Sequence, residues 1–340
     1  MVREWDPRTA PSAEIEAVLS TLNAALAVDL PDDPQWRIQT FREYLSVTMP
    51  GERRVCWLAL PGGREGRHGM HIQGMANVLL LGDIGVLEII VHPKARRTGI
   101  GRLLLAEAVR RAYAEGFASM GVEVIGGTSA VEFYEAHGFR CAFVEIRNVL
   151  QLSTVDWQKL GEMAGGVGSG YRLEYFPGGP PEELYDAYAA AKEIVRDSYE
   201  AGDLELRPSS YEADRLKSSL ATLHARGMKP YIVLGIHEAS GRVAGLTEVV
   251  VPAQHPCRAD QYDTVVVPAH RGYGLGRAMK ARMLFELRSA EPQLTEVQTW
   301  NAFENEPMLR VNGELGFVPD RQWMEYEAEI PDLARFLPTP

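Results

Sequence analysis

A strand, a glycine-containing turn and a helix follow one another twice in this chain of 340 residues, over 87–106 and again over 262–281. The two copies keep one offset, since 271 − 96 = 175, and it holds at apolar, proline, glycine and arginine positions alike. The matching pairs are Val91/Val266, Pro93/Pro268, Gly99/Gly274, Gly101/Gly276, Arg102/Arg277 and Ala106/Ala281. A constant offset across three elements indicates an internal repeat, and the chain is long enough for two domains.

Each copy has the local sequence of a phosphate-binding turn. In the first copy, apolar β-formers from Leu87 to Val91 predict a buried strand, and Pro93 ends it because proline has no N–H to donate. Gly99 and Gly101 leave room for a ligand beside the backbone. The helix that follows begins with unpaired N–H groups at the positive end of its dipole, which favours a phosphate group there.

Two familiar types of phosphate loop do not fit these turns. Neither turn continues into the Gly-Lys-Ser/Thr of a Walker loop. The third glycine of the dinucleotide fingerprint is replaced by Leu104 in the first copy and by Arg277 in the second. A shorter loop remains, in which backbone N–H groups hold a pyrophosphate and Arg96, Arg97, Arg271 and Arg277 can add charge-assisted contacts.

Both turns resemble the acyl-CoA-binding signature of the GCN5-related N-acetyltransferase (GNAT) family, Arg/Gln-x-x-Gly-x-Gly/Ala after a strand. The signature is Arg-Arg-Thr-Gly-Ile-Gly at 96–101 and Arg-Gly-Tyr-Gly-Leu-Gly at 271–276. Each copy also has the closing Gly-Phe element of the family downstream, at 133–139 and at 312–317. Together the two resemblances cover most of the chain.

The resemblance implies an α/β fold with mixed sheets, arranged as two tandem GNAT domains. We expect the first domain at 1–152, a glycine-rich linker at 153–170 and the second domain at 171–340. In this family two N-terminal helices form the wall on the acceptor side of the site. The sequence predicts such helices from about Ser12 onward and over 36–47.

The resemblance further implies acetyl-CoA, or another acyl-CoA, as the cofactor. In the first copy the matching positions are Ile90, Val91, Arg96, Arg97, Thr98, Gly99, Ile100, Gly101 and Arg102. In the second copy they are Val266, Val267, Arg271, Gly272, Tyr273, Gly274, Leu275, Gly276, Arg277, Asn305 and Asn312.

Catalytic roles also follow from the resemblance. Acyl transfer to an amine needs the amine neutral and the leaving thiolate protonated. Glu88 matches the base that the family often places on the central strand, and Asp263 matches it in the second copy, since 263 − 88 = 175. Tyr134 matches the general acid of the family. Aligned on Gly-Phe, with 317 − 139 = 178, the second copy has Asn312 there, which cannot supply a proton at useful pH.

This divergence suggests that the N-terminal domain does the chemistry. The C-terminal domain would then bind acyl-CoA, shape the acceptor site or act as a weaker transferase. The opposite assignment stays open, because the sequence at 299–308 is similar to active members of the family that lack the tyrosine.

As a whole, the resemblance implies an N-acetyltransferase that acts by direct attack on a small primary amine. The tandem layout is also similar to that of mycothiol synthases, so acetylation of a cysteinyl sugar amine is an alternative. A non-catalytic acyl-CoA sensor or scaffold is another.

Charge, cysteine count and hydrophobicity limit the classes of partner and the cellular compartment that we expect for this protein. A net charge of −11 argues against a nucleic-acid partner. Cys56, Cys141 and Cys257 are scattered, so neither a disulfide framework nor a zinc site is indicated. The N-terminus lacks a signal peptide and no apolar run reaches membrane-spanning length. We therefore expect a cytoplasmic protein without a metal. It would be a monomer whose tandem domains form a pseudo-dimer, or a homodimer.

Overall fold

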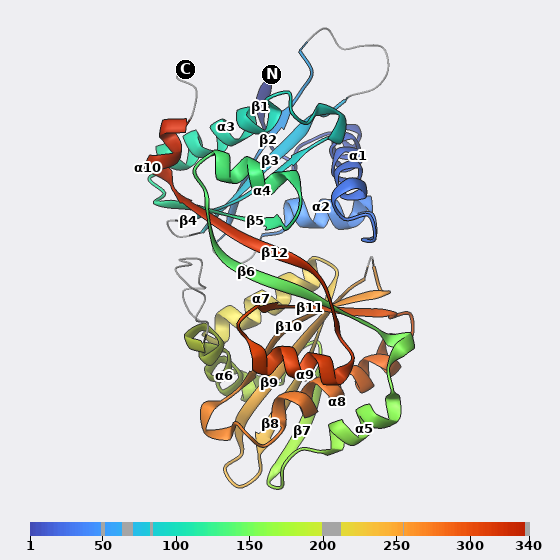
Figure 1. Cartoon of the computed structure of the whole chain (residues 1–340). Helices are drawn as coiled ribbons and strands as arrows, with labels where there is room; N and C mark the ends of the chain where they lie inside the picture. The colour runs from blue at the N-terminus through green and yellow to red at the C-terminus, as the bar shows by residue number, and fades with distance from the viewer. Residues whose placement is uncertain (49–51, 63–70, 82–83, 199–211, 254, 337–340) are drawn as a thin grey trace. The chain divides into compact units, whose positions relative to one another are not determined.

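The computed structural model describes the chain except for residues 49–51, 63–70, 82–83, 199–211, 254 and 337–340 (Figure 1). The chain divides into two compact units. The first unit contains the described residues of Met1–Val144 and those from Trp323 onward. The second unit contains the described residues of Glu145–Gly202 and Arg207–Gln322.

The first unit is built on a mixed sheet. Its strands are β1 (Val2–Trp5), β2 (Arg53–Ala59), β3 (Gly74–Leu81), β4 (Ile84–Val91), β5 (Ser119–Ile125) and β12 (Val318–Glu329), in the order β1-β2-β3-β4-β5-β12. Neighbouring strands are antiparallel except for β4 and β5, which are parallel. Its helices are α1 (Ser12–Asp29), α2 (Ile38–Ser46), α3 (Ile100–Ala114), α4 (Ser129–Ala136) and α10 (Ile330–Leu333).

Helices cover both faces of this sheet, as the alternation along β2 shows. Val55 and Trp57 belong to the apolar cluster that contains residues of α3 and α4. Cys56 and Leu58, between and beyond them, belong to the cluster that contains α1 and α2. Successive side chains of a strand point to opposite faces, so the two helix pairs lie on opposite sides of the sheet. The predicted pair of N-terminal helices therefore packs together on one face.

The second unit repeats this plan. Its sheet has the order β6-β11-β10-β9-β8-β7, with β10 and β11 parallel and the other described neighbours antiparallel. The strands are β6 (Arg140–Gln151), β7 (Tyr171–Pro177), β8 (Met228–His237), β9 (Arg242–Pro252), β10 (Arg258–Val266) and β11 (Glu296–Ala302). The helices are α5 (Trp157–Gly165), α6 (Tyr185–Ser198), α7 (Ala213–Ala225), α8 (Leu275–Ala290) and α9 (Glu306–Leu315). The predicted α/β architecture with mixed sheets is confirmed.

The units do not follow the boundaries predicted at 152 and 171. In β6, residues from Glu145 onward pair with β11 in the second unit. The last strand of the chain, β12, pairs through Trp323–Glu329 with β5 in the first unit. The edge of β5 needs a hydrogen-bonding partner, and a strand that is distant in sequence can be that partner just as a neighbouring strand can. Sequence order alone does not reveal that β12 pairs with β5 and that β6 pairs with β11.

The glycine-rich segment at 153–170 is not an unstructured linker. It contains α5, whose Trp157 packs edge-on against Phe285 of α8, with 5.8 Å between the ring centres. Further on, the Gly168 N–H donates to the Tyr273 carbonyl at 3.1 Å. A Cβ at Gly168 would lie only 3.3 Å from the Tyr273 side chain. This glycine serves a close packing contact with the second repeat.

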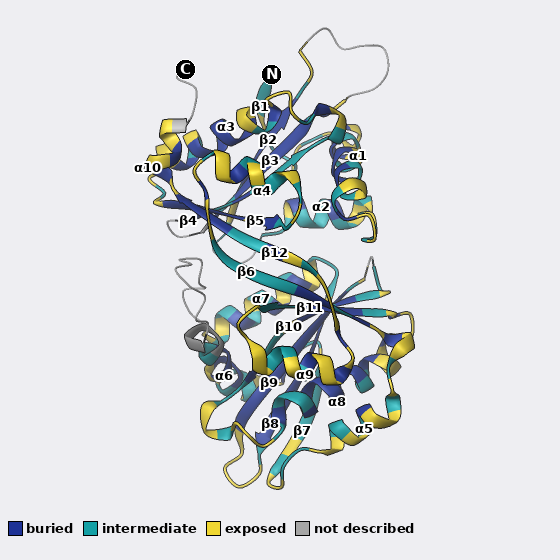
Figure 2. Cartoon of the chain, in the orientation of Figure 1, coloured by how far each residue is buried: buried dark blue, intermediate teal, exposed yellow. Residues whose placement is uncertain are grey.

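Burial explains why the central strands read as continuous apolar runs. From Pro230 to Ile236 and from Val243 to Val251 every residue is buried, which indicates strands covered on both faces (Figure 2). The strands β1, β7 and β12 and the helix α5 were not predicted, because their residues are mostly half-buried or exposed and give a weaker periodic signal.

Candidate active sites

The two predicted phosphate loops have the same backbone geometry. Each follows a short 3-10 turn, at Pro93–Ala95 and at Pro268–His270. Each then reaches a glycine in the left-handed region, Gly99 with φ 88° and Gly274 with φ 75°. These glycines are the N-caps of α3 and α8, and neither helix start has a side-chain cap. The first N–H groups of both helices thus fit an anion such as a pyrophosphate.

The second glycine of the signature, Gly101 in the first copy and Gly276 in the second, has different neighbours in the two copies. An added Cβ at Gly101 would lie 3.2 Å from the Phe133 ring, so this glycine lets α3 pack against α4. A Cβ at Gly276 would meet only Val266, at 3.7 Å, which is ordinary contact. A Cβ therefore fits at Gly276, whereas at Gly101 the Phe133 ring would have to shift by a few tenths of an ångström.

One arginine ties each loop to the preceding strand. Arg96 Nε donates to the Val91 carbonyl at 3.2 Å, and Arg271 Nε donates to the Val266 carbonyl at the same distance. The guanidinium of Arg96 also forms two bonds with Asp29, at 2.8 and 2.5 Å, which join the loop to the end of α1.

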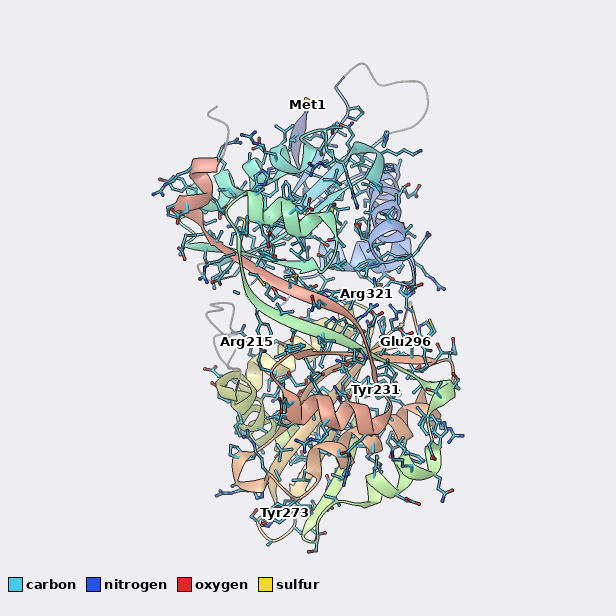
Figure 3. The ribbon with its side chains drawn as sticks, viewed as in Figure 1. Met1, Arg215, Tyr231, Tyr273, Glu296 and Arg321 are labelled. Carbon is cyan, nitrogen blue, oxygen red and sulfur yellow. The ribbon has the colours of Figure 1, made fainter. Side chains whose placement is uncertain are left out.

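The arginines therefore differ in how freely they can meet a ligand. Arg97 and Arg102 are exposed in the first loop, whereas Arg96 is already held by a carboxylate. In the second copy Arg277 pairs with Glu314 at 3.0 Å. Tyr273 of the second loop is exposed at the surface of its unit (Figure 3).

The two parallel strand pairs separate at the same point of the repeat. The β4–β5 ladder ends at Val86, and the β10–β11 ladder ends at Gln261, with 261 − 86 = 175. The strands β4 and β10 continue beyond these points. Glu88 and Asp263 each lie two residues past the end of the parallel ladder of their unit.

Glu88 lies in a small polar network. Its carboxylate accepts hydrogen bonds from the Tyr44 hydroxyl at 3.0 Å and from the amide of Asn77, its partner across the β3–β4 ladder. Arg54 donates to the Asn77 carbonyl oxygen at 2.9 Å and stacks 4.3 Å from the centre of the Tyr44 ring. Burial, and then the charge of Glu88, raise the pKa of Tyr44, so its hydroxyl stays a donor. No described cation forms an ion pair with Glu88 itself.

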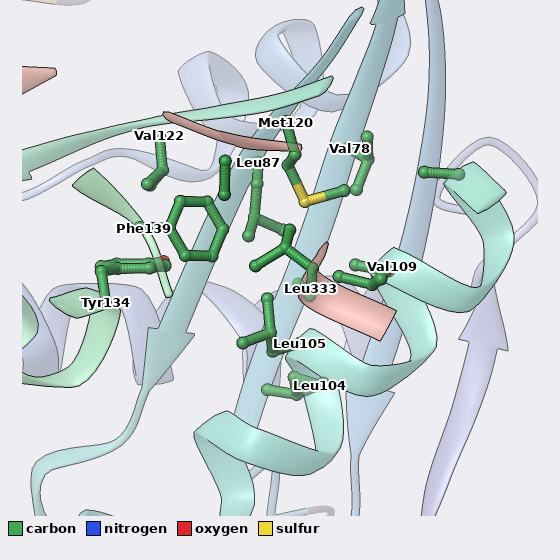
Figure 4. Packing of buried hydrophobic residues seen from close by; sticks show 14 of the residues in the cluster. Val78, Leu87, Leu104, Leu105, Val109, Met120, Val122, Tyr134, Phe139 and Leu333 are labelled. Carbon is green, nitrogen blue, oxygen red and sulfur yellow. The ribbon is translucent and has the colours of Figure 1, made fainter. Parts of the chain in front are cut away.

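Tyr134 lies in the core of the first unit, between Phe133 and Phe139, at 5.0 and 5.1 Å between ring centres (Figure 4). Burial, and after it the charge of Glu88, raise the pKa of Tyr134. The phenol therefore keeps its proton at neutral pH. Its hydroxyl has no hydrogen-bond partner among the described residues, so it is available to a ligand. The fold thus brings the two predicted catalytic residues of the first copy into one electrostatic environment.

The second unit carries another charge arrangement at the matching place. Both β3 and β9 have a glycine, Gly74 and Gly245, opposite the last residue of the repeated strand. Three residues beyond these glycines, Asn77 of the first unit is matched by Glu248 of the second. The second unit therefore has two carboxylates, Glu248 and Asp263, where the first has one.

A buried lysine lies between these carboxylates. Lys192 Nζ is 2.7 Å from Glu248 and 2.7 Å from Asp263, and the Tyr188 hydroxyl also donates to Glu248. Burial alone would lower the pKa of Lys192, but the two carboxylates outweigh it and hold that pKa well above its usual value. Lys192 is therefore an ammonium, and Asp263 is ion-paired, unlike Glu88. The sequence interpretation missed Lys192 and Glu248 because no motif marks them.

A second buried lysine lies beside Asn312. Lys280 Nζ donates to the Asn312 carbonyl oxygen at 2.7 Å, and the Asn312 amide donates to the Asn301 carbonyl oxygen at 2.6 Å. Lys280 is only 1% exposed, and burial lowers its pKa to about 7. Its position could have been noticed in the sequence, because the constant offset aligns it with the apolar Leu105 (280 − 105 = 175).

Asn305, predicted to bind the cofactor, is the N-cap of α9. Its side-chain oxygen accepts from the Met308 N–H at 3.2 Å. This hydrogen bond explains the residue as a helix cap. Its predicted contact with a cofactor stays a prediction.

Two features are absent from the part of the chain that the structure describes. No group of three or more His, Cys, Asp or Glu side chains there could hold a metal ion. Within the same residues, no helix combines the length and apolar character that crossing a membrane requires. Cys56 is buried, Cys141 and Cys257 are exposed, and all three are free thiols.

Comparisons with known proteins agree with this geometry. Residues 53–141 match the family model of the acetyltransferase (GNAT) domain. A tandem GNAT protein from the clavulanic acid biosynthesis pathway has a TM-score of 0.78 at 24% identity, with 97% of this chain and 99% of the other covered. A GCN5-related N-acetyltransferase from Sphaerobacter thermophilus has a TM-score of 0.66 at 16% identity, with 97% and 95% covered.

A third solved structure is the glucosamine N-acetyltransferase region of a fungal multi-domain β-N-acetylglucosaminidase. It has a TM-score of 0.69 at 12% identity and covers 96% of this chain and 38% of the other. No curated protein sequence matches the chain significantly. At these identities the solved structures show the fold alone. Residues 53–141 match the model of the GNAT acetyltransferase domain, and the chain along nearly its whole length has the fold of a tandem GNAT protein.

Proposed function

We propose that this protein transfers an acetyl group from acetyl-CoA to a primary amine of a small molecule, and that the first unit does so. The observation that carries the proposal is the position of Glu88. It lies two residues past the last paired residue of the β4–β5 ladder, and no described residue forms an ion pair with it. Its charge also raises the pKa of the Tyr134 phenol, after burial. A base and an acid are thereby held beside the loop that fits a pyrophosphate.

Each residue has a defined task in this reaction. The N–H groups at the start of α3 hold the pyrophosphate of the donor, and Arg97 and Arg102 add charge. Glu88 takes the proton of the attacking amine, directly or through a water molecule. Tyr134 gives a proton to the sulfur as the carbon–sulfur bond breaks. The acyl carbon passes straight to nitrogen, so no covalent enzyme intermediate is required.

In the second unit, the ion pair between Asp263 and Lys192 weakens Asp263 as a base, and Asn312 replaces the phenol. These differences support the first unit as the main transferase. The congruent second loop supports a second acyl-CoA site there. The acceptor is a proposal at the level of chemical class: the acidic Glu88 favours a cationic amine.

Calorimetric titration with acetyl-CoA tests the two binding sites. We expect two sites in the wild type, loss of the first in Arg97→Glu and loss of the second in Gly276→Glu. Each change places a carboxylate where the pyrophosphate would bind. Arg110→Glu is the control, because it makes the same charge change on the exposed side of α3. Absence of any binding would refute acetyl-CoA as the donor.

Release of CoA, measured with a panel of small primary amines, tests the chemistry. In the Gly276→Glu background, Glu88→Gln and Tyr134→Phe should each lower kcat/KM by about 10²- to 10⁴-fold, as loss of a general base or acid does. Tyr113→Phe is the matched control, since Tyr113 is exposed on α3. If acetyl-CoA binds but no amine releases CoA, the chain is a sensor or scaffold instead.

A further inference from the structure

We propose that Lys280 is the proton donor of the second unit and makes that unit a second acyl-transfer centre. In this role a lysine replaces the tyrosine that serves the first unit. The inference rests on the proposed function, because it assumes that the second loop binds an acyl-CoA. It goes beyond that function in assigning a distinct catalytic residue to a unit that otherwise lacks an acid.

Equivalent hydrogen bonds establish that Asn312 occupies the place of Tyr134. The Phe139 N–H donates to the Tyr134 carbonyl at 3.1 Å, and the Phe317 N–H donates to the Asn312 carbonyl at 3.0 Å. The two helices thus end in the same way before the same phenylalanine. An asparagine amide does not release a proton near neutral pH, so the second unit has lost the acid at this position.

The Lys280 amine lies about as far from Phe317 as the Tyr134 ring lies from Phe139. Its Nζ lies 5.2 Å from the centre of the Phe317 ring, and the Tyr134 ring lies 5.1 Å from that of Phe139. In the first unit the position of Lys280 is taken by Leu105, which lies in the same part of the core as Tyr134 and Phe139 (Figure 4). In the first unit the polar side chain beside this phenylalanine comes from α4, whereas in the second unit it comes from α8.

The surroundings of Lys280 leave its amine free for proton transfer. The amine donates to Asn312 on α9, and Asn301 of β11 completes this chain of amides. No carboxylate in the described part of the chain forms an ion pair with Lys280. The charged side chains next to it on the two helices pair with one another instead; these pairs are Arg277 with Glu314 and Arg282 with Glu286.

Packing alone does not account for a lysine at this position. Burying an ammonium without a counter-charge is costly, and leucine fills the equivalent place in the first unit. Burial lowers the pKa of Lys280 to about 7. Both protonation states are then populated at neutral pH, which is the condition for efficient general acid catalysis.

The proposed step balances as follows. The acceptor nitrogen bonds to the acyl carbon, and the carbon–sulfur bond breaks with its electron pair on sulfur. Lys280 gives its proton to that sulfur and becomes a neutral amine, which solvent then reprotonates. Asp263, which its ion pair with Lys192 makes a weaker base than Glu88, takes the proton of the acceptor amine. The products are the amide and CoA thiol, and no other reactant is consumed.

The first test measures CoA release in the Arg97→Glu background, in which only the second unit binds acetyl-CoA. The rate should fall as the pH rises above about 7, because the donor loses its proton. Lys280→Met should lower the rate by about 10²-fold or more. Lys280→Arg keeps a cation and a hydrogen-bond donor but cannot titrate, so it should remove the pH inflection.

The second test needs no acceptor. When CoA binds to the Arg97→Glu protein at pH 7, its thiol should pass a proton to neutral Lys280, and the ultraviolet absorbance of the thiolate should rise above that of free CoA. Lys280→Met should abolish this rise while CoA still binds. Desulfo-CoA gives the background, including that of the protein thiols.

The outcomes separate this inference from the proposed function. If the second loop binds CoA but Lys280→Met leaves both the rate and the thiolate signal unchanged, the role of Lys280 is refuted while the proposed function stands. If neither acetyl-CoA nor CoA binds to the wild type, the proposed function itself is refuted, and this inference with it.

Discussion

Replacement of Lys192 by methionine should strongly destabilise the second unit. Lys192 Nζ lies 2.7 Å from Glu248 and 2.7 Å from Asp263. The side chains of Lys192 and Glu248 are only 10% and 8% exposed, so water cannot replace the ammonium. Methionine keeps the length of the side chain but leaves two carboxylates without their cation. Removing one partner of a buried pair costs about 3–5 kcal/mol, and we expect a loss in this range.

Lys217 offers a matched control. It pairs with Glu182, also at 2.7 Å, but the two side chains are 37% and 84% exposed. A surface pair of this kind contributes little to stability, so Lys217→Met should leave the second unit almost unchanged. Hydrogen exchange of peptides from β9 and β10, measured over a range of urea concentrations, reports on the second unit separately from the first.

The pH dependence gives a stricter test of the same argument. Without Lys192, burial raises the folded-state pKa of Glu248 above its unfolded value of about 4. Below the unfolded value Glu248 is protonated in either state, and the loss of unfolding free energy in the variant is small. This loss then grows as the pH rises toward the folded-state pKa. A loss equal at pH 5 and pH 7, or no larger than that of Lys217→Met, would refute the role assigned to this charge cluster.

Three further predictions follow from the geometry. Alanine at Gly99 or Gly274 should lower the unfolding free energy by about 1–2 kcal/mol, because φ is 88° and 75° there and an L-residue is strained in this region. Thermal melting measures this loss, and an unchanged Tm would show that the loop rearranges. The pKa of Lys280 is about 7 in the folded state and near 10.5 in the unfolded state, so the unfolded state binds more protons between these values. The unfolding free energy of the second unit should therefore rise from pH 7 to pH 10, and Lys280→Met should remove that rise. The same pH dependence in the variant would contradict the effect of burial on Lys280. Burial raises the pKa of Cys56 to about 12, whereas Cys141 and Cys257 are exposed. An aromatic disulfide reagent at pH 8 should therefore modify Cys141 and Cys257 quickly and Cys56 only after unfolding. Rapid modification of all three thiols would show that Cys56 on β2 is accessible to solvent in the folded protein.

The repeated strand, turn and helix could be predicted closely because their sequence signals are local. Pro93 predicts the end of the first repeated strand, and β4 ends at Val91, two residues before it. The glycines of the two turns predict close approach of the backbone to a ligand, and the structure adds that Gly99 and Gly274 are left-handed. Local signals suffice when a turn needs a particular backbone conformation or a missing N–H.

Contacts between distant segments could not be predicted in this way. The pairing of Trp323–Glu329 with β5 and the bond from Arg96 to Asp29 depend on which segments meet in space. Lys192 is 71 residues from Asp263, as 263 − 192 = 71, and no pattern on α6 indicates which carboxylates it meets. The glycines near 166–170 were interpreted as flexible, although Gly168 is fixed against the second loop.

Divergence between the copies has to be judged in pairs of residues. Considered alone, Asn312 means that the second copy lacks the acid that Tyr134 provides in the first. Considered with Lys280, Asn312 is the hydrogen-bond acceptor that positions a buried amine near Phe317. Likewise, the exchange of Asn77 for Glu248 would add an unbalanced buried charge, and Lys192 supplies the balance. Asn312 is accompanied by Lys280 on α8, and Glu248 is accompanied by Lys192 on α6. In each pair the second residue supplies the charge or the proton that the first difference calls for. These paired differences support our proposal that the second copy is a working site built with different side chains, and the experiments on Lys192 and Lys280 test its two halves independently.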